Sequence, residues 1–246
     1  MKNEEIKKEL DELRVKLDNL TALVTSLFGV NLSKQLSGTP VIPTCSEEST
    51  GVSSLVLRKP IMYFYNMTGL SQQFTVDFKN NKIPDSVPEV RKDNKLVFTV
   101  EADSSINGKY NYLYYEFEID KEPKSNTYTY VRNNKDLYDN LIRLCQAIGL
   151  QGQEQIDFAC YWELELKRLD CEYYKCEIFT EDKLDKLFPM EISPTPDYFI
   201  RRYVKFVPSD KLGKGNLDSN SLRKARVGAW RICEWGGLIS GQTKIH

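Results

Sequence analysis

The first thirty residues of the chain place an apolar side chain at every third or fourth position. Steps of four and three alternate, so these side chains fall on one side of an α-helix. Glu9 and Arg14 carry opposite charges beside this seam, as in paired helices. A helix this short is marginal alone in water, so its apolar face needs a cover. The pattern predicts an amphipathic helix over residues 6–28, with an apolar face made of Ile6, Leu10, Leu13, Leu17, Leu20, Leu23, Val24, Leu27 and Phe28.

The apolar face of this predicted helix can cover its own domain or bind another subunit, and we favour the second interpretation. Residues 31–54 are rich in Ser, Thr, Pro and Gly, and Pro40 and Pro43 disfavour a helix there. An extended connector of this length would let the helix reach a neighbouring molecule. The sequence therefore predicts a helical arm (1–30), a connector (31–54) and a body (55–246).

The body consists of short segments rich in aromatic and β-branched residues, separated by turn residues, which is typical of β-strands. Thr68-Gly69 is expected to join the first two strands as a hairpin, and Asn107-Gly108 is a second turn signal. The expected strands are 55–65, 73–78, 95–101, 110–119, 127–132, 160–168, 172–179, 198–207 and 227–235. This count favours a mainly β (α+β) fold, an antiparallel β-sandwich with the protruding N-terminal helix and one or two further helices.

Helical spacing is clear over residues 134–148, where Gly149 is a stop signal. Residues 181–187 form at most a short helix. Between these segments, Trp162, Leu164 and Leu166 alternate with charged residues, which predicts a strand over 160–168.

Composition excludes several functions. The single histidine is His246, so histidine-based catalysis and histidine zinc sites are not expected. A net charge of −1 and a pI near 6.0 do not favour nucleic acid or an anionic membrane as a partner. The charged start and the lack of a long apolar run indicate neither a secretory signal nor a membrane span. The six cysteines are not spaced as metal ligands are, and they suggest reduced thiols in a cytosol. Neither a metal nor a required cofactor is therefore expected.

Two patterns allow a chemical interpretation. Glu163 and Glu165 would point the same way on a strand, as an acid/base pair could, but alternating charge on a solvent face is much commoner and identifies no catalytic residue.

Gly213-Lys214-Gly215 lacks the Ser or Thr of a Walker phosphate loop. The surrounding basic run is either a solvated loop or a nucleotide/phosphate contact formed by Lys211, Lys214, Arg223, Lys224 and Arg226. Arg201 and Arg202 could act similarly, or lie on two faces of an edge strand.

The chain has 14 tyrosines, concentrated in the predicted strands. Strands favour tyrosine, and tyrosine also suits protein–protein contacts. Tyrosine and lysine both lose a proton near pH 10, so a surface rich in both would change charge steeply in alkali. The expected pH-sensing residues are Tyr110, Tyr112, Tyr114, Tyr115, Tyr173 and Tyr174.

Residues 136–166 resemble a segment of cypovirus polyhedrins. In both, a helix leads into Tyr161-Trp162 and then Glu163-Leu164-Glu165-Leu166, and tyrosine-rich strands follow an N-terminal helix. About eighty residues follow this stretch here, more than the resemblance implies.

The resemblance implies a non-enzymatic structural protein, a homotrimer of β-sandwiches whose N-terminal helices bind neighbours in a crystal lattice. Polyhedrins crystallise as occlusion bodies in the cytoplasm of infected insect cells and embed virus particles, and alkaline gut dissolves them. Some members hold nucleotides in the lattice, which would give the basic run a role. The alternatives are a viral attachment module trimerised by a coiled coil, and an enzyme with a carboxylate pair at Glu163.

Overall fold

The computed structural model describes residues 55–83, 85–89, 93–119, 122–169, 171–219, 222 and 228–240, so the predicted arm and connector lie outside the described residues. The described part belongs to one compact unit, Val52–His246. It is mainly β with three helices, which confirms the predicted class. The elements are β1 (Leu55–Asn66), β2 (Gln72–Asp77), β3 (Ser86–Val87), β4 (Lys95–Val100), β5 (Leu113–Tyr115), β6 (Phe117–Ile119), β7 (Tyr128–Arg132), α2 (Leu137–Ile148), α3 (Gln153–Lys167), β8 (Tyr173–Phe179), α4 (Glu181–Leu187), β9 (Glu191–Ser193), β10 (Tyr198–Ser209) and β11 (Trp230–Ile239).

The described strands form two sheets. The larger has the order β3-β5-β1-β11-β10-β8-β7, with β6 paired to the beginning of β1, and the smaller has the order β4-β2-β9. At the centre of the larger sheet, β10 and β11 run parallel, from Tyr198 opposite Arg231 to Phe206 opposite Ile239. The sheet is therefore mixed, and the expectation of purely antiparallel pairing is wrong there. A parallel pair needs a long connection, and residues 210–229 provide it.

The predicted hairpin between the first two strands is also wrong, because β1 and β2 belong to different sheets. Asn66, at the end of β1, redirects the chain. Its side-chain nitrogen donates to the carbonyl oxygens of Leu70 and Glu101 at 2.7 and 2.9 Å, and its side-chain oxygen accepts from the Thr68 amide. These bonds hold a wide turn that leads the chain to the other sheet.

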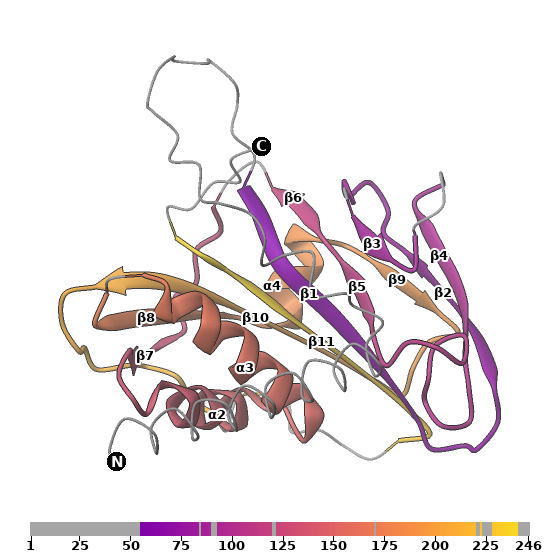
Figure 1. The fold of residues 1–246 in the computed structure, drawn as a ribbon. Helices are drawn as coiled ribbons and strands as arrows, with labels where there is room; N and C mark the ends of the chain where they lie inside the picture. Colours follow the sequence, from indigo (N-terminus) through magenta and orange to yellow (C-terminus); the bar gives the residue numbers. More distant parts are fainter. Residues whose placement is uncertain are drawn as a thin grey trace, which may run out of the picture. The chain divides into compact units, whose positions relative to one another are not determined.

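The larger sheet has a core on each face. On β1, Ile61 and Tyr63 belong to the core shared with α2 and α3, whereas Met62 and Phe64 belong to the core shared with β2 and β4. Successive strand residues point to opposite faces, so a strand covered on both sides is apolar at nearly every position. Figure 1 shows α2 and α3 beside the strands β8, β10 and β11, with β2, β4 and β9 grouped apart from these helices.

The strand predicted over 160–168 is wrong, because this stretch is the second half of helix α3. Phe158, Trp162 and Leu166 form the buried row of the helix, one residue per turn. Leu164 lies between them in sequence but points the other way and is 56% exposed. The helix has two apolar rows, and together they imitate the alternation of a strand.

Helix α3 packs closely on the sheet at Gly237 of β11. A Cβ atom at Gly237 would overlap the Val204 carbonyl oxygen and lie 2.7 Å from Cζ2 of Trp162. Only glycine leaves room for the indole against the strand, so this position fixes how α3 sits on the sheet.

The predicted turn and helix end are confirmed. Asn107 and Gly108 both have positive φ, 53° and 61°, and the Lys109 amide bonds the Ile106 carbonyl, as in a tight hairpin turn. Gly149 ends α2 in the left-handed conformation at φ 86°.

Candidate functional site

The most unusual feature of the described body is a carboxylate buried in the middle of the larger sheet. Glu234 of β11 is fully buried and forms an ion pair with Arg201 on the neighbouring strand β10. The hydroxyls of Tyr115 and Tyr203 both donate to its Oε1 at 2.6 Å. A buried carboxylate is stable only when charged and hydrogen-bonded partners surround it, and three such partners do so here.

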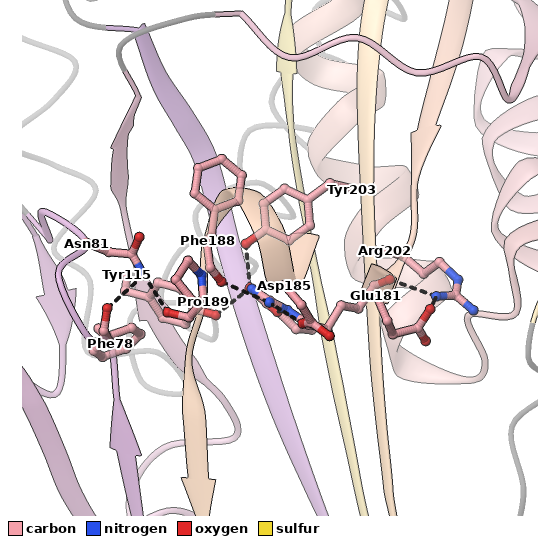
Figure 2. A network of polar contacts seen from close by, with 11 residues as sticks. Phe78, Asn81, Tyr115, Glu181, Asp185, Phe188, Pro189, Arg202 and Tyr203 are labelled. Carbon is pink, nitrogen blue, oxygen red and sulfur yellow. Dashed lines mark hydrogen bonds and ion pairs between the residues drawn. The ribbon is translucent and has the colours of Figure 1, made fainter. Parts of the chain in front are cut away.

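Arg201 extends this network to the end of helix α4. Its Nη1 contacts the Asp185 carboxylate at 2.9 Å and the Phe188 carbonyl oxygen at 3.0 Å. Figure 2 shows Tyr203, Phe188 and Asp185 close together, with Pro189 and Asn81 to one side of them. Asn81 donates to the Phe78 and Pro189 carbonyl oxygens, which ties the segment after β2 to the same region.

A second tyrosine–carboxylate contact lies between β1 and helix α3. The Tyr63 hydroxyl donates to Asp157, whose other oxygen accepts from Gln153 at 2.8 Å. The Tyr63 ring stacks on Tyr65 and meets the edge of Tyr112, so three tyrosines gather at this end of the helix. On β5, one strand in from the edge of the larger sheet, the Tyr114 hydroxyl donates to Glu116 at 2.7 Å.

We refer to these four contacts as the tyrosine–carboxylate pairs: Tyr63–Asp157, Tyr114–Glu116, Tyr115–Glu234 and Tyr203–Glu234. Burial, and then the facing carboxylate, raises the pKa of every tyrosine in them above the ordinary value near 10. The hydroxyl must keep its proton to donate it. In strong alkali its loss would leave two negative charges at hydrogen-bond distance, so each pair is sensitive to alkali.

The six tyrosines predicted to sense pH have different positions. Tyr115 and Tyr174 are buried, Tyr112 and Tyr114 are half-buried, and burial raises the pKa of all four. The remaining two, Tyr110 and Tyr173, are also half-buried. For Tyr173, a hydrogen bond with Glu172 raises the pKa.

The prediction missed Glu234, Asp157 and Tyr203 because no local motif marks them. One signal was available. Strand β10 has Arg201, Arg202 and Lys205 within an apolar run, and charged side chains in such a run are buried only when paired. All three are at most 4% exposed, so the alternative that Arg201 and Arg202 lie on an edge strand is wrong, although they do point to opposite faces.

The other buried cations also hold elements together. Arg202 donates to the Ile148 carbonyl oxygen at the end of α2 and to Glu181 of α4, both at 2.6 Å. Lys205 pairs with Glu177 at 2.8 Å. On the helix side, Arg231 makes two contacts, at 2.5 and 3.0 Å, with the fully buried Glu154 of α3.

In the described part of the predicted phosphate loop, the two glycines have a packing role. A Cβ atom at Gly213 would overlap the Tyr130 ring, and one at Gly215 would lie 2.9 Å from the Thr129 backbone. The glycines therefore let this loop run against the edge strand β7, where Asn216 bonds the strand backbone. Lys211 and Lys214 are exposed, and the other three basic residues of the prediction (Arg223, Lys224 and Arg226) lie outside the described residues.

The carboxylate pair predicted on a strand is not formed. Glu163 and Glu165 lie on helix α3, where residues two apart do not face each other. Glu163 pairs with Lys167 and Glu165 with Arg168, both at 2.6 Å. The acid/base interpretation of this stretch therefore has no geometric basis.

A scan against protein-family models, a search of curated proteins and a search of solved structures each found no match to the chain. Within the described ranges, no group of three or more His, Cys, Asp or Glu residues could hold a metal ion. No helix in that part of the chain is long and apolar enough to cross a membrane.

Proposed function

We propose that this chain is a non-enzymatic, self-assembling structural protein that forms the crystalline matrix of viral occlusion bodies. It would be stable at neutral pH and would dissolve in alkali. The observation that carries the proposal is the set of tyrosine–carboxylate pairs. Two of them meet at the buried Glu234 in the larger sheet, and a third, Tyr63–Asp157, joins that sheet to helix α3. The resemblance of residues 136–166 to polyhedrins supports it independently.

The pairs supply a physical reason for dissolution in alkali. An unfolded tyrosine ionises near pH 10, whereas these buried tyrosines keep their protons to higher pH. The unfolded chain therefore gains ionised groups first, and the folded body loses stability as pH rises above about 10. Below that pH the pairs remain hydrogen-bonded. A matrix built on such a body would persist in neutral conditions and loosen in alkali.

In this proposal the body is a β-sandwich that assembles as a homotrimer, and the N-terminal arm binds neighbouring subunits in the lattice. The partners are other copies of the chain and the virus particles that the lattice embeds, in the cytoplasm of infected cells. The proposal includes no membrane, metal or specific nucleic acid. A nucleotide bound in the lattice near Lys214 would be an additional ligand that assembly does not require.

The test is microscopy of cells that express the untagged chain, followed by washing any particles from pH 7 to pH 11. Faceted cytoplasmic particles that persist at neutral pH and dissolve in alkali are expected. Leu13→Asp and Leu20→Asp should abolish particles while the body stays folded, because they place a charge in the predicted apolar face of the arm. Normal particles from both variants would contradict the role of the arm. A wild-type chain that stays a soluble trimer at high concentration would favour the attachment module instead.

A further inference from the structure

Helix α3 has an apolar row on the side that faces away from the sheet. Ile156, Cys160 and Leu164 follow each other at intervals of four residues, so they lie along one line of the helix. Ile156 is 44% exposed, Leu164 is 56% exposed, and the Cys160 side chain is exposed between them. This outer row is two residues out of step with the buried Phe158, Trp162 and Leu166, and two residues correspond to about 200° around a helix.

The outer row is the most extended exposed apolar feature of the described residues. The other exposed large apolar side chains are on turns or loops, on the short strand β3 or at the end of α4: Met67, Leu70, Val87, Leu187 and Leu212. A row along one helix has the geometry into which a second amphipathic helix packs, because ridges of one helix fit grooves of the other. Around the row, Lys167 is paired with Glu163, so the rim carries charges of both signs.

We propose that the outer row of α3 is the docking surface for the heptad segment, residues 6–28, of a second copy of this chain. The inference rests on the proposed function, because it names the surface through which the arm joins two copies. The heptad segment brings the complementary face, an apolar stripe with both Glu9 and Arg14 at its edges.

The lengths of the two features allow the arm to join two copies. From Ile156 to Leu164 the row is about 12 Å long, whereas a helical stripe from Ile6 to Leu27 would be about 32 Å long. One outer row covers less than half of such a stripe, so the stripe keeps apolar surface for a further contact, as a segment that joins two copies needs. The connector of about 24 residues can extend to about 80 Å, which is enough to reach a neighbour.

Cys160 lies in the middle of the row and allows a direct test with the full chain. Cysteine is introduced at Leu10, Leu17 or Val24 in turn, and assembled protein is treated with a short bismaleimide crosslinker. We expect a crosslinked dimer in which the introduced cysteine is joined to Cys160, at least tenfold more abundant than for Ala22→Cys, which would lie on the opposite side of the arm. The dimer should be lost when Cys160→Ser is added.

Three results would overturn the inference. A dimer that persists with Cys160→Ser would show that the introduced cysteine lies beside another arm or another cysteine, and not beside the outer row. A link to Cys160 found only within single chains would show that the arm covers its own body. Sedimenting assemblies without any link to Cys160 would show that the arm binds elsewhere.

A substitution on the receiving surface tests the same inference independently. Leu164→Asp should remove sedimenting assemblies, with the melting temperature of the soluble chain unchanged, because Leu164 is mostly exposed. Leu212→Asp is the matched control, since Leu212 is 61% exposed but lies in the loop after β10. This variant should assemble normally. Equal sedimentation of both variants would overturn the inference. Wild-type chain that does not sediment would instead refute the proposed function, together with this inference.

Discussion

At the scale of single residues, the described body depends on hydroxyls that must keep their protons. Tyr115 and Tyr203 share one oxygen of Glu234, and Tyr63 donates to Asp157. Each tyrosine has a pKa above its unfolded value, chiefly because it is buried. Its contribution to stability is therefore complete below about pH 10 and declines above it, by about 1.4 kcal/mol per pH unit until the folded tyrosine ionises.

Tyr63→Phe separates the hydrogen bond from the titration. At pH 7 the variant should be less stable by about 1 kcal/mol, because Asp157 loses one donor. Above pH 10 the wild type loses stability faster, because only the wild type has the titrating hydroxyl, so the two stability curves should cross near pH 11, within about one unit. Urea unfolding at pH 7 to 11 measures this. Parallel curves over the whole range would show that Tyr63 plays no part in the alkaline response.

Gly237 gives a second prediction at this scale. Gly237→Ala should lower the free energy of unfolding by about 1–3 kcal/mol, because the new Cβ overlaps the Val204 backbone and presses on Trp162. Gly69→Asn is the control, since a Cβ there meets nothing within 4 Å and asparagine tolerates positive φ. Urea unfolding that finds equal loss in the two variants would mean that Trp162 shifts freely and that α3 is not fixed at this point.

At the scale of elements, the sequence predicted those whose pattern matches one simple environment. Helix α2 buries a single face and ends at Gly149, and β4 alternates between buried and half-buried residues. The prediction of a strand in place of α3 was wrong because Leu164 belongs to a second apolar row. Only the packing of α3 on the sheet distinguishes this row from the buried one. The parallel pairing of β10 with β11, and with it the site at Glu234, could not be predicted either, because strand order depends on contacts between residues far apart in the sequence.

The loop over β7 offers a prediction about an element. Asn216→Ala should speed amide exchange at Tyr128 and lower stability by about 1 kcal/mol, because the Tyr128 amide loses its acceptor at an exposed sheet edge. Lys214→Ala, two residues away and exposed, should change neither quantity. Hydrogen exchange followed residue by residue makes the comparison. Unchanged exchange at Tyr128 in the first variant would show that the loop does not protect this edge.

At the scale of the whole molecule, buried charged side chains join the larger sheet to the three helices of the described body. Arg231–Glu154 links β11 to α3, Arg202 links β10 to α2 and α4, and Arg201–Glu234 joins the two central strands. Breaking such a pair leaves an uncompensated buried charge, which costs about 3–5 kcal/mol. The larger sheet and these helices should therefore unfold together, and an assembly that depends on them should respond to pH as one unit.

We expect that particles dissolve because the body unfolds. Tyr63→Phe removes a hydroxyl that ionises first in the unfolded chain, so less stability is lost in alkali and the variant is the more stable form above about pH 11. Both the unfolding midpoint, followed by near-ultraviolet circular dichroism, and the dissolution midpoint, followed by turbidity, should move to higher pH together. Tyr110→Phe, a half-buried position outside the tyrosine–carboxylate pairs, controls for the loss of a hydroxyl and should move neither. If Tyr63→Phe moves unfolding while dissolution stays in place, the contacts between copies, rather than the interior tyrosines, set the pH at which particles dissolve.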